Sequence, residues 1–453
     1  MSAIVAISTP QAVGGVSMLR ISGDGAFGIA AKVFKPAGGK SIHEMKGYTA
    51  CYGDIFDGGE LLDDGVLLVF RAPHSYTGED VCEISCHGGI YITRKVLQAC
   101  INAGAVPAEA GEFTKRALLN GKMSLTQAEA VIDVINAQSK QYLDCSNAQR
   151  EGALYRRIEE ISQQILDITV QIAAWIDYPD EMLDSFESSS HLGQLENCRC
   201  QLQFLLESYD IGKVLREGVL TAIVGKPNVG KSTLMNLLVG SQRSIVTDIA
   251  GTTRDIVEET VMLGGAVLRI ADCAGLRETD DVVEGIGVEM MLKKLEEASL
   301  VLAVFDSSRP LDRDDYTLLE KLKGKQCICI INKADLEQKL DMPFLASKFG
   351  RVIEISANDR NSLKKLNDVV EKTLDLERLD MSAGFIANER QRKCAEDAEK
   401  AVAAAIEGIQ MGITLDAIGV MLEKALDSLM QLSGKSVSET VIDEVFKRFC
   451  VGK

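Results

Sequence analysis

The first part of the chain alternates short apolar runs with polar positions. Four runs have the period-two spacing of half-buried strands, at residues 4–8, 16–21, 65–70 and 81–85. Residues 93–103 have instead the 3.6-residue spacing of an amphipathic helix. We therefore expect an N-terminal α/β domain over residues 1–118.

The pattern then becomes helical. Thr126 and Glu129 have the spacing of a capping box, and apolar positions at helical spacing follow them. Further helical patterns extend over residues 154–174, 192–207 and 388–449. These helices flank a region in which strand and helix patterns alternate.

This order predicts an α/β domain inserted into an all-α domain. We expect the first half of the helical domain at 119–215, the inserted domain at 216–378 and the second helical half at 379–453. The predicted fold class is thus α/β plus all-α.

A phosphate-binding sequence opens the inserted domain. Residues 225–232 read GKPNVGKS, which is G-x-x-x-x-G-K-[ST], after an apolar run and before a helical pattern. In a Ras-like P-loop GTPase fold, the glycines let backbone N–H groups close around phosphates, and Lys231 acts catalytically by neutralising charge on the β- and γ-phosphates. The predicted phosphate contacts are Asn228, Val229, Gly230, Lys231, Ser232 and Thr233.

The sequence NKAD, at residues 332–335, ends a later apolar run and indicates guanine. The carboxylate of Asp335 would accept hydrogen bonds from N1 and N2 of guanine, a donor pair that adenine lacks. The loop after the next predicted strand suits a contact to guanine O6. The expected base-binding residues are Asn332, Lys333, Asp335, Ser356, Ala357 and Asn358.

Two further segments lie between these motifs. Residues 247–255 form a Gly/Thr-rich loop, and 272–275 read D-x-x-G, in which Asp272 would reach Mg²⁺ through water and the Gly275 amide would sense the γ-phosphate. Leu276 stands where many small GTPases have a water-orienting glutamine. Candidates for that role, each of which could also be only a solvated charge, are Glu278, Asp280, Asp281 and Glu284.

Composition restricts the partners and the compartment. Among 453 residues the net charge is −17, so any RNA contact must be local or delivered by a partner. Twelve scattered cysteines with no C-x-x-C pair, and no apolar run of membrane-spanning length, favour a reduced, cytoplasmic protein. Residues 23–28 also match G-x-G-x-x-G, which keeps a dinucleotide-binding fold as an alternative for the N-terminal domain.

Several segments beyond the nucleotide motifs carry a resemblance that covers the whole chain. They are IVAISTP and GGVSMLRISG within 4–23, TGEDVCEISCHGG at 77–89, GEFTKRALLNGKM at 111–123, TDIAGTTRD at 247–255 and CVGK at 450–453. With them the chain resembles the MnmE (or TrmE) family, GTPases that act with the partner MnmG on the wobble uridine of certain tRNAs.

The resemblance implies ligands and residue roles. The N-terminal domain of the family dimerises and binds a tetrahydrofolate derivative, and Glu284 matches the family's water-orienting glutamate. Cys450 matches the cysteine of the C-terminal motif and is a catalytic candidate of open chemical role. The implied folate ligands are Arg20, Glu83, Lys122 and Lys453. The implied ligands are Ser232 and Thr253 for Mg²⁺, and Asn228, Thr247, Ile249 and Thr252 for K⁺. Thr247, Thr252 and Thr253 would also contact GTP.

The implied function is that of a homodimeric, K⁺-activated GTP hydrolase. With MnmG, which uses FAD and NADH, it would install a carboxymethylaminomethyl or aminomethyl group at C5 of uridine 34 of tRNA, in a heterotetramer. One alternative is a GTP-gated RNA-binding or ribosome-assembly factor. Another is a folate-dependent transferase with a regulatory nucleotide domain.

Overall fold

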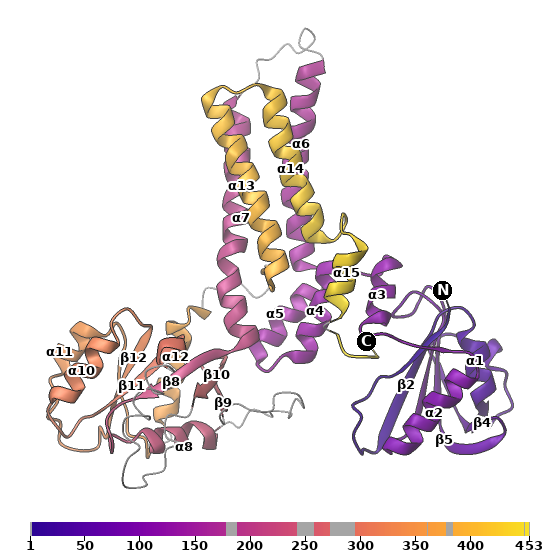
Figure 1. Ribbon diagram of the computed structural model, residues 1–453, viewed down its shortest axis with the longest axis horizontal. Coiled ribbons are helices and arrows are strands. Elements are labelled where there is room, and N and C mark those ends of the chain that lie inside the picture. The colour runs from indigo at the N-terminus through magenta and orange to yellow at the C-terminus, as the bar shows by residue number, and fades with distance from the viewer. Residues whose placement is uncertain are drawn as a thin grey trace. The chain divides into compact units, whose positions relative to one another are not determined.

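A computed structural model describes residues 2–177, 188–241, 258–271, 295–359, 361–376, 384–447 and 449–452. Figure 1 shows the helices and strands along the chain. The chain divides into two compact units, one of residues 1–132, 150–162 and 426–453, the other of 133–149 and 163–425. The three boundaries between the four predicted segments stay a prediction.

The N-terminal α/β region contains a seven-stranded sheet in the order β3-β4-β5-β6-β2-β1-β7. Only β1 and β7 pair in parallel. The strands are β1 (Ile4–Ile7), β2 (Val16–Ser22), β3 (Phe34–Pro36), β4 (Thr49–Asp57), β5 (Glu60–Phe70), β6 (Val81–His87) and β7 (Val106–Pro107).

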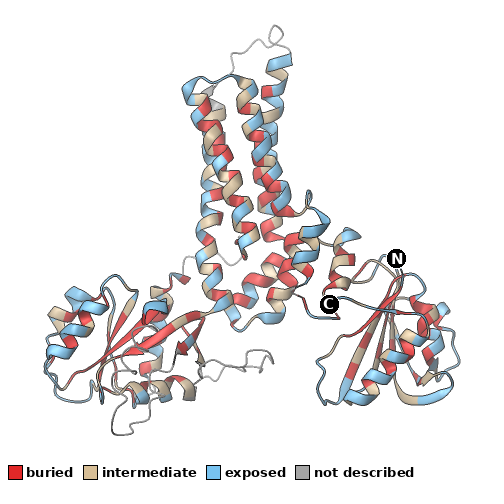
Figure 2. Ribbon diagram, in the orientation of Figure 1, coloured by how far each residue is buried: buried red, intermediate tan, exposed pale blue. Residues whose placement is uncertain are grey.

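Two helices, α1 (Ala26–Val33) and α2 (Ile90–Asn102), contribute to the core of this region, and a 3-10 turn, η1 (Ile42–Glu44), lies beside α1. Buried residues alternate with less buried ones along β2, the second half of β5 and β6, and Figure 2 colours each residue by its burial. Such alternation is the reason that the period-two pattern located these strands.

The strand pairing excludes the dinucleotide-binding alternative. Strand β2, which precedes the G-x-G-x-x-G segment, pairs antiparallel with both β1 and β6. Strand β3, which follows α1, pairs only with β4. A dinucleotide fold needs a parallel β-α-β unit at this place. Gly25 serves instead as the left-handed N-cap of α1.

The helical regions follow the predicted order. The helices are α3 (Glu112–Leu119), α4 (Leu125–Asn136), α5 (Lys140–Arg150), α6 (Ala153–Asp177), α7 (Ser188–Glu217), α13 (Glu389–Met411), α14 (Leu415–Ser433) and α15 (Glu439–Phe446).

The predicted capping box at Thr126 and Glu129 is wrong. Helix α4 begins at Leu125, and its cap is Ser124 with Gln127: the Gln127 amide donates to Ser124 Oγ (3.3 Å), and the Ser124 amide donates to Gln127 Oε1 (2.9 Å). Two capping patterns overlap in this sequence, and the structure uses the earlier one.

The inserted domain is a six-stranded sheet in the order β13-β12-β11-β8-β10-β9, parallel except for the β9–β10 pair. Its strands are β8 (Val219–Val224), β9 (Glu258–Leu263), β10 (Ala266–Ala271), β11 (Leu300–Asp306), β12 (Cys327–Asn332) and β13 (Val352–Glu354). The described helices are α8 (Lys231–Ser241), α10 (Arg313–Lys321), α11 (Met342–Lys348) and α12 (Ser362–Thr373).

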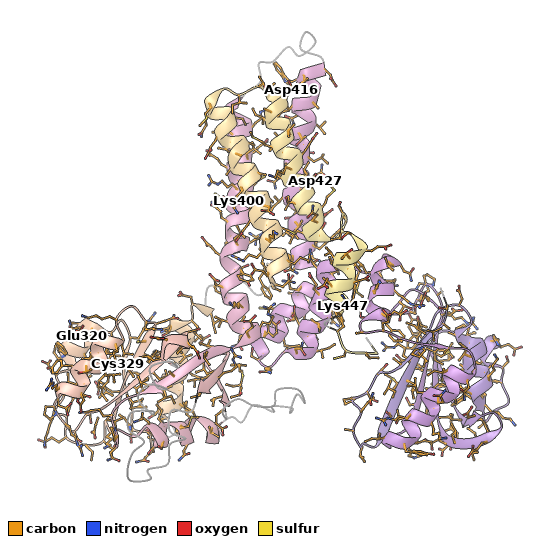
Figure 3. All side chains as sticks on the ribbon, in the orientation of Figure 1. Glu320, Cys329, Lys400, Asp416, Asp427 and Lys447 are labelled. Atoms are coloured by element: carbon orange, nitrogen blue, oxygen red, sulfur yellow. The ribbon has the colours of Figure 1, made fainter. Side chains whose placement is uncertain are left out.

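Apolar clusters fill both faces of this sheet. Cys329, labelled in Figure 3, belongs to one of them, and burial raises the pKa of its thiol to about 12. The fold is therefore the predicted combination of an α/β N-terminal domain, helices and a P-loop domain. No described helix is both long and apolar enough to span a membrane.

Candidate nucleotide site

The P-loop joins the buried end of β8 to the first turn of α8. Gly225 has φ +151°, and a Cβ there would lie 2.4 Å from the carbonyl oxygen of Val304 on the neighbouring strand β11. Gly230 has φ +98°, and a Cβ there would lie 2.1 Å from Asn332 Nδ2. Only glycine fits at either position, so the loop can keep its backbone turned toward a bound phosphate.

The catalytic candidate Lys231 lies folded over this loop. Its ammonium donates to the carbonyl oxygens of Gly225 (2.8 Å) and Lys226 (2.7 Å). Ser232 and Thr233 follow in the first helical turn with exposed side chains. The helix start therefore presents one cation and two hydroxyls, together with its unpaired backbone N–H groups.

A single side chain ties three of the predicted motifs together. Asn332, 3% exposed at the end of β12, donates from Nδ2 to the carbonyl oxygen of Val229 (2.9 Å). Its Oδ1 accepts from the backbone amide of Ala357 (2.9 Å). The phosphate loop, NKAD and the loop after β13 are thus held by one buried amide.

Lys333 forms a second link. It adopts a left-handed conformation (φ +61°), and its ammonium donates to the carbonyl oxygen of Asn228 (3.0 Å) and to Asp306 Oδ2 (2.5 Å). Burial alone would raise the pKa of Asp306, but hydrogen bonds from Lys333 and Ser308 outweigh it and hold the pKa below its ordinary value. The Asp306 carboxylate is therefore ionised at neutral pH and fixes Lys333 electrostatically.

Sequence reasoning missed Asp306. A signal was available, because Asp306 closes the buried strand β11 as Asn332 closes β12, and the two residues are direct register partners. Ends of adjacent parallel strands meet at one edge of a sheet, where ligands bind in such folds.

A third link was also not predicted from the sequence. Lys226, inside the phosphate loop, forms ion pairs with Asp312 Oδ2 (2.5 Å) and Asp315 Oδ2 (2.8 Å). These two aspartates form the capping box of α10. The loop is thereby attached to a neighbouring helix as well as to NKAD.

The expected base-reading residues lie on adjacent loops. The Ala334 amide donates to the carbonyl oxygen of Ile355 (3.1 Å), which joins NKAD to the segment of Ser356, Ala357 and Asn358. Asp335, next in the chain, is exposed. The backbone of the base-reading loop is fixed while the carboxylate stays accessible, as recognition of guanine requires.

Several predicted residues lie outside the described part of the chain. They are Thr247, Ile249, Thr252, Thr253, Asp272, Gly275, Glu284 and Lys453.

The predicted folate residues of the N-terminal domain are partly brought together. Arg20 on β2 and its register partner Glu83 on β6 form an ion pair of 2.7 Å, each side chain only 12–13% exposed. The Arg20 guanidinium lies 5.6 Å from the ring centroids of both Tyr76 and Phe113. Lys122 donates to the carbonyl oxygen of Pro73 (3.0 Å), three residues before Tyr76. A charged pair flanked by aromatic rings is suited to a flat, polar heterocycle.

The C-terminal segment is docked on the same domain. Val451 bridges to Ala110, and the Ser8 hydroxyl donates to the carbonyl oxygen of Gly452 (3.3 Å). Gly452 has φ +100°, and a Cβ there would lie 2.4 Å from the carbonyl oxygen of Ile7. Cys450 itself is exposed. The segment is therefore held by its backbone, which leaves the thiol accessible.

Comparisons with known proteins agree with this geometry. The family model described as the MnmE helical domain matches residues 125–450, and that of the GTP-binding protein TrmE N-terminus matches residues 3–122. The protein named tRNA modification GTPase MnmE of Clostridioides difficile is 39% identical over 99% of both chains. The proteins of that name from Thermoanaerobacter pseudethanolicus and Listeria welshimeri are each 40% identical over 99% of both chains.

A solved structure, the G domain of the T. maritima FeoB iron transporter, is 27% identical and covers 35% of this chain and 99% of its own, with a TM-score of 0.26. A TM-score this low does not support a fold assignment, so the fold of the inserted domain is assigned from its strand order. The two family models together span nearly the whole chain, and the resemblance seen in the sequence is confirmed. The chain belongs to the MnmE family of tRNA modification GTPases.

Proposed function

We propose that this chain is a K⁺-activated GTPase that acts with MnmG to modify C5 of the wobble uridine of certain tRNAs. The observation that carries the GTPase assignment is the buried Asn332 amide, which joins the phosphate loop to both predicted base-reading loops. The names of the relatives support the tRNA as substrate.

The residues present fit the ions that such a reaction needs. Ser232 would hold Mg²⁺, which supplies charge neutralisation at the β- and γ-phosphates. Asn228, exposed in the left-handed conformation (φ +64°), would offer its side-chain oxygen to K⁺. The chain's own residues bind the triphosphate, orient the water and bring Lys231 to the charge that develops during transfer of the γ-phosphoryl group.

The proposal extends to the N-terminal domain. Arg20 and Glu83 would bind a tetrahydrofolate derivative that provides the one-carbon unit, in a cytoplasmic homodimer. The oxidation and reduction steps would belong to MnmG with its FAD and NADH, which would join the dimer in a heterotetramer.

The test of the proposed function is GTP turnover in K⁺ and in Na⁺ at equal ionic strength. We expect kcat to fall strongly in Na⁺, because Na⁺ is too small for a K⁺ site and no arginine finger was identified in the sequence. Asn228→Gly keeps the left-handed backbone but removes the side-chain oxygen, so this variant should lose most of the difference between the salts. Equal rates of the unaltered protein in the two salts would contradict K⁺ activation.

Glu284 is the proposed water-orienting residue, because Leu276 cannot take that role. We expect Glu284→Ala to lower kcat by about 10²-fold with little change in GTP affinity, the usual size of a general-base or water-orienting effect. The measurement is single-turnover hydrolysis together with the Kd of a labelled guanine nucleotide. Asp281→Ala is the control, and a larger defect in that variant would show that the glutamate was misassigned.

A further inference from the structure

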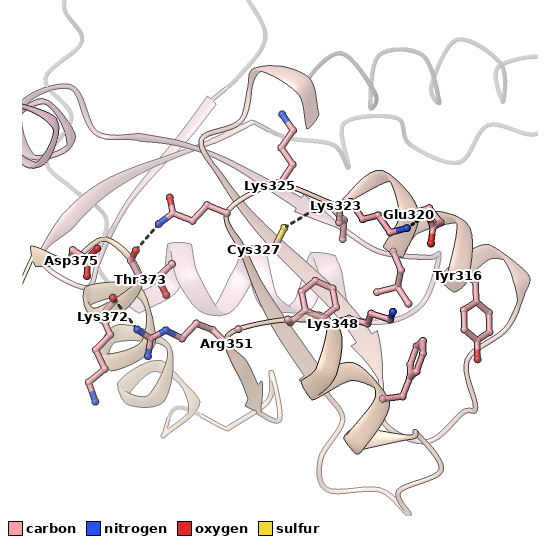
Figure 4. Close-up of a pocket in the computed structure, with 17 residues that line it drawn as sticks. Tyr316, Glu320, Lys323, Lys325, Cys327, Lys348, Arg351, Lys372, Thr373 and Asp375 are labelled. Carbon is pink, nitrogen blue, oxygen red and sulfur yellow. Dashed lines mark hydrogen bonds and ion pairs between the residues drawn. The ribbon is translucent and has the colours of Figure 1, made fainter.

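A basic groove lies in the inserted domain at the amino-terminal ends of β12 and β13. Its volume is about 560 Å³, and its cations are Lys323, Lys325, Lys348, Arg351 and Lys372. Cys327, the first residue of β12, lines it, whereas Asn332, the last residue of that strand, belongs to the nucleotide site. The groove is therefore at the opposite edge of the sheet from the GTP site. Figure 4 shows its cations on several segments around Cys327.

Two carboxylates, of Glu320 and Asp375, also line the groove, so its cations outnumber its carboxylates by five to two. Lys323 pairs with Glu320 (2.5 Å). The other four cations form no ion pair with any residue in the described ranges. Lys325 donates a hydrogen bond to the carbonyl oxygen of Glu296 (2.8 Å), and Arg351 donates one to the carbonyl oxygen of Lys372 (3.3 Å). Lys348 lies 5.5 Å from the centroid of the Phe344 ring. Four clustered cations repel one another, and an anionic ligand would relieve that repulsion.

The charge of the whole chain makes this cluster informative. With a net charge of −17 the chain as a whole repels nucleic acid, so contact with RNA phosphates needs a local concentration of lysine and arginine. Spaced cations along an open groove suit a chain of phosphates better than one small anion.

Aromatic side chains at one end of the groove favour RNA among the anionic ligands. Tyr316, 49% exposed, packs edge-on against Phe344 with 5.7 Å between the ring centroids. An exposed aromatic ring beside a row of cations, as Tyr316 is here, is a feature with which proteins bind unpaired bases and their backbone.

We infer that this groove binds the phosphate backbone of the RNA substrate, with Tyr316 stacking on an unpaired base. The inference rests on the proposed function for the kind of RNA and adds a contact surface on the GTPase domain, separate from the nucleotide. It places part of the tRNA-binding energy in the domain that hydrolyses GTP.

The test compares two triple variants of the full chain with equal changes in charge. One removes the groove cations (K348E/R351E/K372E). The other alters three exposed lysines on helices α7 and α13 (K213E/K393E/K400E), of which Lys400 is labelled in Figure 3. The readout is fluorescence anisotropy of a labelled, unmodified tRNA transcript over a range of KCl concentrations, with GTP hydrolysis measured in parallel to verify folding.

We expect the groove variant to raise the Kd for tRNA tenfold or more and to reduce the slope of log K against log salt by about 3, about one for each phosphate that the groove no longer neutralises. The control variant should change the Kd less than about threefold, since it has only the general repulsion of added negative charge. GTP turnover without tRNA should be the same in both. Tyr316→Ala should weaken binding of a single-stranded RNA about fivefold, the lower end of the range for the stacking of one base.

Equal tRNA affinity of the two variants would overturn the inference. So would a groove variant that binds tRNA normally but fails to modify it with MnmG, because the groove would then serve an acidic protein. A failure of the proposed function would look different: the unaltered chain would not support wobble-uridine modification at all, while the anisotropy comparison would still decide whether the groove binds RNA.

Discussion

Asp335→Asn is expected to lower the affinity for GTP by about 10³-fold or more and to shift the preference toward xanthosine triphosphate. Sites built on hydrogen bonds discriminate by about 10⁴ against a ligand that leaves their groups unpaired. An asparagine keeps one acceptor for N1 but turns a donor toward the N2 amine of guanine. Xanthine has an oxygen, O2, at that position, and this oxygen can accept a hydrogen bond from the asparagine amide.

The structure explains why the substitution should act on the base contact alone. The Asp335 side chain is exposed, whereas its loop is held by backbone hydrogen bonds, Ala334 to Ile355 (3.1 Å) and Leu336 to Lys333 (2.9 Å). An amide of the same shape should leave these bonds intact. The loop is therefore expected to present asparagine where it presented aspartate.

The measurement is competition of GTP and xanthosine triphosphate against a labelled nucleotide. The matched control is Asp314→Asn, an equally conservative change at an exposed position in the first turn of α10. It should leave both affinities unchanged. An Asp335→Asn protein that binds GTP as tightly as before would mean that another residue reads the base.

The nucleotide motifs could be predicted from the sequence because each is contiguous. Within each motif, 225–232 or NKAD, the residues lie within a few positions of one another. The apolar run before each motif indicated the strand, β8 or β12. Local spacing determines such loops, so no knowledge of the strand order was needed.

The links between the motifs could not be predicted in this way. Asn332 contacts Val229 across 103 positions, and Lys226 contacts Asp312 across 86. These contacts depend on which strands are neighbours, and the hydrophobic pattern does not contain the strand order. Asp306 was missed for the same reason, since its role appears only once β11 is placed beside β12.

The cap of α4 lies two residues before the predicted one, at Ser124. Leu125 is fully buried, and a Cβ at Gly434, far along the chain, would lie only 2.3 Å from Leu125 Cβ. Helix α4 begins at this leucine, so the chain is already helical at Thr126. Ser124 is therefore the cap, with Gln127 as its partner, although the alternative pair Thr126 and Glu129 would offer a charged glutamate as the partner.

The docked C-terminus connects Cys450 to the predicted folate residues. Gly452 lies against Ile7, whose neighbour Ala6 is the register partner of Arg20. The carbonyl oxygen of Cys450 accepts from the Gly111 amide (3.4 Å), two residues before Phe113, whose ring contacts the Arg20 guanidinium. The segment is thus held by strand β1, which pairs with β2 at Arg20, and by the loop before Phe113, which contacts Arg20. The segment with the exposed thiol therefore belongs to the same region of the N-terminal domain.

We expect Cys450→Ser, or deletion of residues 450–453, to abolish tRNA modification with MnmG while GTP hydrolysis stays nearly intact. The segment that carries the thiol is bonded to the N-terminal domain, at Ser8, Ala110 and Gly111. The measurement pairs phosphate release with mass-spectrometric analysis of the wobble nucleoside. Cys200→Ser is the matched control because Cys200, on α7, is the other exposed cysteine among the described residues.

A second variant separates the thiol from its docking. Gly452→Ala keeps Cys450, but the left-handed backbone (φ +100°) and the 2.4 Å approach to the Ile7 oxygen leave no room for a methyl group. It should displace the segment and cause the same loss of modification as Cys450→Ser. Full modification by Gly452→Ala would show that the thiol acts without docking. Full modification by the truncated chain would show that the segment has no part in the reaction.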